Sequence, residues 1–229
     1  MAIEIGMLLF PDLTQLDLTG PYEVFQRMAG ARVHLVWKDR APVSARGGLC
    51  LLPTTTFDEC PALDVLFVPG GFGQLALQDD AETLAFLRSQ GARAPWVTSV
   101  CTGALLLGAA GLLDGYAATT HWAYAELLEA FGARRTEGRV VFDRNRVTGG
   151  GVTAGIDFAL ELVARIEGEA AARAIALQIE YDPEPRGRGG HPRVADEATV
   201  SLVRARLGPA VEAQRARLAR APSGTPRDR

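Results

Sequence analysis

The stretch that decides the fold runs from Trp96 to Gly111 and reads W-V-T-S-V-C-T-G-A-L-L-L-G-A-A-G. An apolar run that favours a strand ends at Cys101, and a run that favours a helix begins at Ala104. Since only Thr102 and Gly103 lie between the two, a very tight strand-to-helix turn must join them. A turn of this kind lifts its central side chain clear of the sheet. The sequence therefore predicts that the Cys101 thiol is presented at the end of a strand.

Cys101 has two alternative roles in such a turn. As a nucleophile, it would occupy a nucleophile elbow of the kind that presents serine in α/β-hydrolases, with sulfur in place of oxygen. The dipole of the following helix would then favour the thiolate over the thiol. As a structural residue, it would be a small buried hydrophobic side chain, the usual role of cysteine at the end of an apolar strand. The local pattern leaves both roles open.

Strands alternate with helices along the chain on both sides of this turn. Strands are predicted at Ile3 to Phe10, Ala31 to Lys38, Val65 to Val68, Trp96 to Val100, Val140 to Asp143 and Arg146 to Thr148. Helices are predicted to begin at Thr19-Gly20-Pro21, after Cys101 and near His121, and to span Glu82 to Gln90, Thr153 to Ile166 and Glu169 to Ile179. The alternation predicts an α/β fold, a three-layer sandwich with a mostly parallel central sheet.

The composition changes near Asp182. Residues 1–181 are predicted to form the α/β domain. Residues 182–229 are predicted to hold a connector rich in proline, glycine and arginine, one helix from about Ala195 to Leu218, and a disordered tail from Ala221. The late helix lacks a strongly basic face with bulky aromatic residues, so we expect it to pack on protein rather than on a membrane.

Bulk composition excludes several classes of function. The chain has 229 residues, is 48% hydrophobic and carries a net charge of −3, so it can build a substantial core and is not expected to bind nucleic acid or an anionic membrane. No leader or membrane span is expected, which predicts a cytoplasmic protein. Three cysteines without C-x-x-C spacing argue against a disulfide framework or structural zinc. With only three scattered histidines, no catalytic metal is expected either.

Four loops follow predicted strands and should gather at one edge of the sheet, where the reactive loops of parallel sheets lie. They contain Asp17, Gly70-Gly71, Cys101 and the glycines at 149–151. This convergence favours the nucleophile over the structural role of Cys101.

Asp17 lies between two leucines in Q-L-D-L-T, just past the first strand. Burial in that apolar setting should raise its pKa, and a nearby thiolate should also keep it protonated, so it could act as a general acid. The alternative is a loop residue that caps the helix starting at Gly20. Glu23 is the competing acid, although a glutamate in the first turn also suits the helix dipole.

Backbone donors and a histidine complete the candidate set. Gly70 and Gly71 could point their N–H groups into a cavity and, with the N–H of Thr102, bind a developing negative charge. His121 could pair with Cys101 or help to bind the substrate, but a role in starting a helix by bonding to the backbone is favoured.

These residues fall in motifs that carry a family resemblance. The motifs are L-D-L-T-G-P at 16–21, V-P-G-G at 68–71, V-T-S-V-C-T-G-A at 97–104, A-T-T-H-W at 118–122 and T-G-G-G-V-T-A-G-I-D at 148–157. From Ile3 to Tyr181 the sequence resembles the ThiJ/PfpI superfamily, which is related to class I glutamine amidotransferase domains. Within it, the sequence is most similar to the isocyanide hydratases. The resemblance implies a flavodoxin-like homodimer that needs no cofactor.

The resemblance also implies roles for individual residues. It implies Cys101 as the nucleophile, Asp17 as its acidic partner and Thr102 as a hydrogen-bonding neighbour. Protease-like relatives usually have histidine directly after the cysteine, so Thr102 argues against peptidase activity. The glycine-rich wall around Gly150, with apolar residues near Val152, would border the substrate.

The activity implied is addition of water to a small isocyanide to give an N-substituted formamide through a Cys101 thioimidate. One alternative is a glyoxalase or deglycase that acts on reactive carbonyls such as methylglyoxal with the same thiol. Another is a ligand-sensing domain like those at the front of AraC-type regulators. Those regulators continue into two helix-turn-helix motifs, whereas one apolar-faced helix is expected after Asp182, which argues against DNA binding.

Overall fold

The central element is a seven-stranded sheet with the order β10-β11-β7-β6-β1-β2-β5. Its strands are β1 (Ile3–Leu8), β2 (Ala31–Trp37), β5 (Thr55–Thr56), β6 (Val65–Val68), β7 (Trp96–Val100), β10 (Val140–Asp143) and β11 (Arg146–Gly149). All neighbours are parallel except β10 and β11, which form an antiparallel hairpin at one edge. The computed structural model, which describes residues 2–184 and 189–220, thus confirms the predicted mostly parallel sheet.

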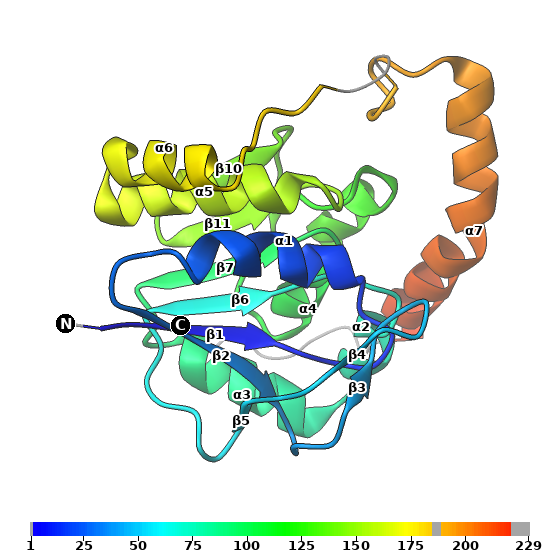
Figure 1. The fold of residues 1–229 in the computed structure, drawn as a ribbon. Coiled ribbons are helices and arrows are strands. Elements are labelled where there is room, and N and C mark those ends of the chain that lie inside the picture. The colour runs from blue at the N-terminus through cyan, green and yellow to red at the C-terminus, as the bar shows by residue number, and fades with distance from the viewer. Residues whose placement is uncertain (1, 185–188, 221–229) are drawn as a thin grey trace. The chain divides into compact units, whose positions relative to one another are not determined.

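Helices cover both faces of this sheet, as Figure 1 shows. Helices α1 (Gln15–Phe25) and α5 (Ala154–Glu167) lie on one face, and α3 (Ala81–Gly91) and α4 (Gly103–Ala109) lie on the other. The remaining elements of this unit are the hairpin β3 (Val43–Ser44) and β4 (Cys50–Leu51), the short helix α2 (Gln74–Leu77), the pair β8 (Ala117–Ala118) and β9 (Arg134–Arg135), the 3₁₀ helix η1 (Trp122–Phe131), and α6 (Glu169–Gln178). The arrangement is the predicted three-layer sandwich.

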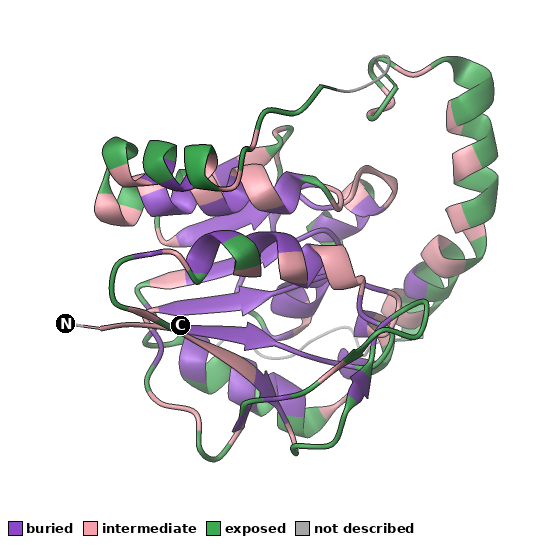
Figure 2. Ribbon diagram, in the orientation of Figure 1, coloured by how far each residue is buried: buried purple, intermediate pink, exposed green. Residues whose placement is uncertain are grey.

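The core lies between the sheet and its helices, where Figure 2 shows the central strands β6, β7 and β11 largely buried. Phe25 of α1, Phe67 of β6 and Phe158 of α5 are fully buried there. Phe67 and Phe158 have ring centroids 5.7 Å apart, and each also lies edge-on to Phe25, at 6.2 Å for Phe67 and 6.3 Å for Phe158. Because the three rings come from three elements, their contacts fix α1 and α5 on the same face of the sheet.

The register of the sheet brings three strand ends together. Val68 of β6 lies opposite Ser99 of β7, and Gly149 of β11 lies opposite Val100 of β7. The residues that follow these strands therefore meet at one edge of the sheet, as the sequence predicts for the loops at Gly70, Cys101 and Gly150.

The start of the first helix was predicted wrongly. Helix α1 begins at Gln15 rather than near Thr19, and Pro21 lies inside it. The tertiary structure sets this start, because the N–H of Thr14, the residue before the helix, donates to the carbonyl of Gly70 at 2.9 Å. Asp17 therefore lies in the first turn of a helix, and the alternative of a loop residue capping a helix at Gly20 is wrong.

Other boundaries agree closely with the sequence patterns. The element that begins after His121 is a 3₁₀ helix, and β5, β8, β9 and α2 were not predicted. These elements have two to four residues, too few to show a periodic apolar pattern.

Residues 1–184 and 185–229 form two compact units. The second contains α7 (Glu197–Arg220), close to the helix predicted there, with Pro209 inside it. The predicted tail from Ala221 lies outside the described residues, as do residues 185–188 of the predicted connector, and the functional division at residue 182 stays a prediction. In the described part of the chain, no helix has the length and apolar character needed to span a membrane.

The aromatic cluster yields a prediction about stability. We expect Phe158→Ala to lower the free energy of unfolding by about 3–5 kcal/mol, because it leaves a cavity between α1, α5 and the sheet. Chemical denaturation measures this change. Leu177→Ala, at a side chain of α6 that is 82% exposed, is the control and should cost little. Equal losses in the two variants would contradict the assignment of the core.

Candidate active site

Cys101 occupies a strained turn between β7 and α4. Its φ is +54°, a left-handed conformation that few residues other than glycine adopt. Its N–H donates to the carbonyls of Gly149 and Gly150, at 3.1 and 2.8 Å, and its own carbonyl accepts the Thr120 hydroxyl at 2.6 Å. These bonds hold the backbone in the strained conformation, as the nucleophile-elbow prediction requires.

The Asp17 carboxyl lies beside this turn and is completely buried. Its Oδ2 accepts the N–H of Gly70 at 3.1 Å. Its Oδ1 is buried without a hydrogen-bond partner among the residues that the structure describes. The carbonyl of Gly70 in turn accepts the N–H of Thr14 at 2.9 Å, so both polar groups of Gly70 bind the start of α1. The structure thus brings Asp17 and Cys101 together, as the sequence predicts.

Gly70 is the point where the three segments converge. A Cβ at this position would lie 2.6 Å from the Thr102 nitrogen, 2.7 Å from Asp17 Oδ2 and 2.8 Å from the Cys101 Cβ. Carbon atoms do not approach such groups this closely, so any side chain here would push the acid and the thiol apart. Only glycine allows this approach.

The electrostatics of the pair follow from its burial. Burial raises the pKa of Asp17 to about 7, against smaller lowering effects of the Cys101 thiol and the Gly70 N–H. Burial and the nearby Asp17 carboxylate raise the pKa of Cys101 well above its ordinary value, although the Thr102 N–H stabilises the thiolate. At neutral pH the thiol therefore keeps its proton, and Asp17 is divided between its two forms. The raised pKa of Asp17 agrees with the sequence prediction, whereas the favoured thiolate does not, because desolvation outweighs the helix N-terminus.

The N–H groups of Gly70 and Gly71 are not free donors in this structure. Asp17 occupies the first, and the Thr102 hydroxyl oxygen accepts the second at 2.9 Å. The Thr102 hydroxyl also donates to the Gly71 carbonyl at 3.3 Å. Both N–H groups are therefore bound in this structure, and their predicted role in binding a developing negative charge stays a prediction. They position the acid and Thr102, and both the N–H and the side chain of Thr102 lower the pKa of Cys101, the N–H by more.

The glycine-rich wall also supports the elbow through its backbone. Gly150 accepts the Cys101 N–H, and its own N–H donates to the Arg139 carbonyl at 2.9 Å. Val152 is half-buried next to this segment. Both were predicted to border the substrate, and that role stays a prediction.

His121 starts η1 in the way that the structural interpretation requires. Its Nδ1 accepts the N–H of Ala123 at 3.3 Å. Burial lowers the pKa of His121 to about 4, so the ring is neutral near pH 7. A neutral ring cannot form an ion pair with a Cys101 thiolate. The role of His121 in binding substrate stays a prediction.

One residue near the thiol was not identified from the sequence. Tyr124 lies in η1, and its phenol is within electrostatic range of both Cys101 and Arg46. The A-T-T-H-W motif that ends two residues earlier was the available signal, because Thr120 in that motif binds the Cys101 carbonyl.

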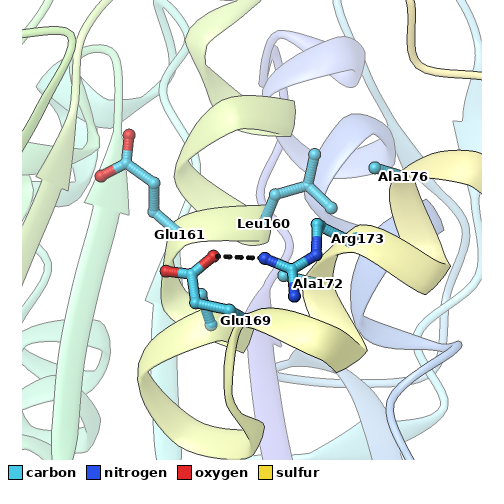
Figure 3. Close-up of a pocket in the computed structure, with 7 residues that line it drawn as sticks. Leu160, Glu161, Glu169, Ala172, Arg173 and Ala176 are labelled. Atoms are coloured by element: carbon cyan, nitrogen blue, oxygen red, sulfur yellow. Dashed lines mark ion pairs between the residues drawn. The ribbon is translucent and has the colours of Figure 1, made fainter.

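A separate groove lies between α5 and α6, as Figure 3 shows. Its walls include Leu160, Glu161, Ala164, Glu169, Ala172 and Arg173, with an ion pair of 3.9 Å between Glu169 and Arg173. None of the predicted site residues lines it. Within residues 2–184 and 189–220, no three side chains of His, Cys, Asp or Glu are grouped so that they could hold a metal ion.

The DJ-1/PfpI family pattern matches residues 4–165. The chain belongs to the DJ-1/PfpI family. A solved ThiJ/PfpI family protein from Pseudomonas syringae superposes with a TM-score of 0.93 and 45% identity, covering 96% of this chain and 91% of that one. DJ-1 from Toxoplasma gondii superposes with a TM-score of 0.71 and 26% identity, covering 80% of this chain and all of its own.

Two curated relatives of this DJ-1/PfpI chain differ in activity. Isonitrile hydratase from Pseudomonas putida is 54% identical over 212 residues, 93% of each chain. The HTH-type transcriptional regulator GbdR from Pseudomonas aeruginosa is 34% identical over 198 residues, which are 83% of this chain and 53% of the regulator.

The Asp17 carboxylate should control the reactivity of Cys101. We expect Asp17→Asn to lower the pKa of Cys101, because it removes a nearby negative charge. The pH dependence of iodoacetamide alkylation, followed at Cys101 by peptide mass spectrometry, measures this pKa. Glu23→Gln removes a more exposed acid on the same helix and should leave the pH profile unchanged. An unchanged profile in Asp17→Asn would show that the two groups are not coupled.

Asp17 should also make stability depend on pH. Its ordinary pKa is 3.8 and its folded pKa is about 7, so the folded state binds this proton more tightly than the unfolded state. The contribution of Asp17 to stability therefore falls as the pH rises from about 4 to about 7, by on the order of 4 kcal/mol. We expect Asp17→Asn to lack this loss in denaturation curves measured across that window. The exposed Asp12→Asn is the control, and an identical pH dependence in wild type and Asp17→Asn would contradict the raised pKa.

Proposed function

We propose that this protein is an isocyanide hydratase, which adds water to an isocyanide to give an N-substituted formamide. The observation that carries the proposal is the 54% identity to isonitrile hydratase of Pseudomonas putida across 93% of both chains. The buried pair of Cys101 and Asp17 supports it, because a nucleophile beside an acid of pKa about 7 suits a reaction that needs proton transfer in both directions.

In the first half of the proposed reaction, Cys101 attacks the terminal carbon of the isocyanide. The Asp17 carboxylate takes the proton of the thiol as the new bond between sulfur and carbon forms. Asp17 then gives this proton to the same carbon, and the triple bond between carbon and nitrogen becomes a double bond. The product is a thioimidate that carries one hydrogen on its carbon. Asp17 Oδ1, which has no other partner among the described residues, is available for these transfers.

In the second half, water adds to the thioimidate carbon. Asp17 takes one proton from the water and passes it to the nitrogen, so the carbon now bears a hydroxyl, an amine and the sulfur. The bond between carbon and sulfur then breaks, and the hydroxyl proton returns through Asp17 to Cys101. The formamide leaves, and both residues regain their starting state. The Thr102 N–H stabilises negative charge on the sulfur while it is the nucleophile and the leaving group.

The burial of the site is consistent with an uncharged substrate. Cys101 is 5% exposed and Asp17 is fully buried, so a charged substrate would lose its hydration on entry. An isocyanide carries no net charge and avoids that cost. We further propose that Gly150, Val152 and His121 border its substituent, and that the protein works as a homodimer without a cofactor.

The catalytic roles can be tested with two variants. We expect Cys101→Ala to abolish formamide formation from an alkyl or aryl isocyanide, because no thioimidate can form. We expect Asp17→Asn to lower kcat by at least about 100-fold, the usual size of a lost general acid–base catalyst. Product is followed by chromatography, and trapping of the thioimidate on wild-type protein by intact mass is a second readout.

Cys50→Ser, at an exposed thiol, is the matched control and should retain full activity. Full activity of the Cys101→Ala variant would contradict the mechanism. If the wild-type protein formed no formamide, the proposed function itself would be contradicted.

A second candidate is ligand sensing without turnover, which the match to the regulator GbdR over 83% of this chain favours. Calorimetry with the isocyanide separates the two, because a sensor would bind the compound and leave it unchanged. Methylglyoxal, assayed in parallel, tests whether the same thiol acts on reactive carbonyls.

A further inference from the structure

Tyr124 is held next to the nucleophile by a short chain of contacts. Thr120 donates its hydroxyl to the Cys101 carbonyl at 2.6 Å, and the next residue, His121, starts η1. The N–H of Tyr124 donates to the His121 carbonyl at 2.9 Å, and the two rings meet edge to face with centroids 6.0 Å apart. The position of Tyr124 is therefore fixed relative to the Cys101 backbone through one turn of helix.

The ring of His121 also contacts the other side of the site. A Cβ at Gly151 would lie 3.1 Å from its Cδ2, so this ring packs closely on the glycine-rich segment that accepts the Cys101 N–H. His121 and Tyr124 thus form a continuous aromatic wall next to the elbow. A substrate bonded to the sulfur would lie against this wall.

The hydroxyl of Tyr124 has no role yet in the proposed mechanism. The residue is 6% exposed, and no hydrogen bond to its hydroxyl is found within the described residues. Burial and then the charge of a Cys101 thiolate raise the pKa of Tyr124, while Arg46 lowers it by less. The phenol therefore stays protonated at neutral pH. The hydroxyl oxygen is not fully buried, so it is open to a ligand that supplies an acceptor for its proton.

We infer that Tyr124 is a third catalytic residue, whose hydroxyl donates a hydrogen bond to the nitrogen of the substrate while Cys101 bonds to its terminal carbon. This inference rests on the proposed hydratase function. An isocyanide nitrogen becomes a better acceptor as the sulfur adds, because the triple bond becomes a double bond and a lone pair forms on nitrogen. The hydrogen bond strengthens in the transition state, and Tyr124 neither gains nor loses a proton over the cycle.

The test is the Tyr124→Phe variant, which keeps the ring and removes only the donor. We expect kcat for isocyanide hydration to fall by about 10- to 100-fold with little change in KM, because the bond matters most in the transition state. In single-turnover experiments, thioimidate formation followed by intact mass should slow by the same factor. The rate of Cys101 alkylation by iodoacetamide should stay as in wild type, because this reagent has no acceptor nitrogen at the corresponding position.

Tyr116→Phe is the matched control, since that ring lies under the guanidinium groups of Arg144 and Arg146, at 3.6 and 4.5 Å. It should leave kcat unchanged. Wild-type turnover in Tyr124→Phe would overturn the inference while leaving the hydratase function intact. An equal fall in hydration and in alkylation would also overturn it, because Tyr124 would then act through the thiol. If the wild-type protein did not hydrate the isocyanide, the proposed function itself would be contradicted.

Discussion

The hydrogen bond from the Gly70 N–H to the Asp17 carboxylate is the contact on which the site depends. It joins the loop after β6 to the first turn of α1, and the Gly70 carbonyl strengthens the connection by accepting the N–H of Thr14. The same glycine leaves no room for a side chain between Asp17, Cys101 and Thr102. The acid and the thiol can therefore approach each other only because position 70 has no Cβ. A backbone constraint, and not an ion pair, holds the two reactive groups together.

This approach takes place in the protein interior, and that sets the protonation of both groups. Desolvation disfavours the thiolate and the carboxylate alike, so the pair holds more protons than the two groups would hold in water. The resting nucleophile is a neutral thiol beside an acid that is half ionised near pH 7. In the proposed reaction the thiol is activated only when its proton can move to Asp17, so the nucleophile is charged chiefly when substrate is present to accept it. Such a site suits a small uncharged electrophile and disfavours charged ones.

The residues around Cys101 and Asp17 stabilise the strained turn at Cys101 and add no further charge. Carbonyl groups of Gly149 and Gly150 accept the N–H of the strained Cys101, and the Thr120 hydroxyl donates to its carbonyl. His121 is neutral and starts a helix, and that helix carries Tyr124 toward the thiol. The bonds to the Cys101 backbone join segments far apart in the sequence. The aromatic core of Phe25, Phe67 and Phe158 supports them from below, because it fixes α1, which carries Asp17, against the sheet.

The alternation of strands and helices and the tight turn at Cys101 follow from the sequence alone, because both depend on residues that are neighbours along the chain. The leucines on either side of Asp17 were enough to predict its raised pKa, but the burial that raises it is completed by the fold. The sequence did not determine where α1 begins, since that start depends on a hydrogen bond to Gly70, 56 residues after Thr14. Nor did it show that the N–H groups of Gly70 and Gly71 are already bound, that desolvation outweighs the helix dipole at Cys101, or that Tyr124 faces the site. These features were decided by the tertiary structure, because hydrogen-bond partners and burial depend on segments that only folding brings together.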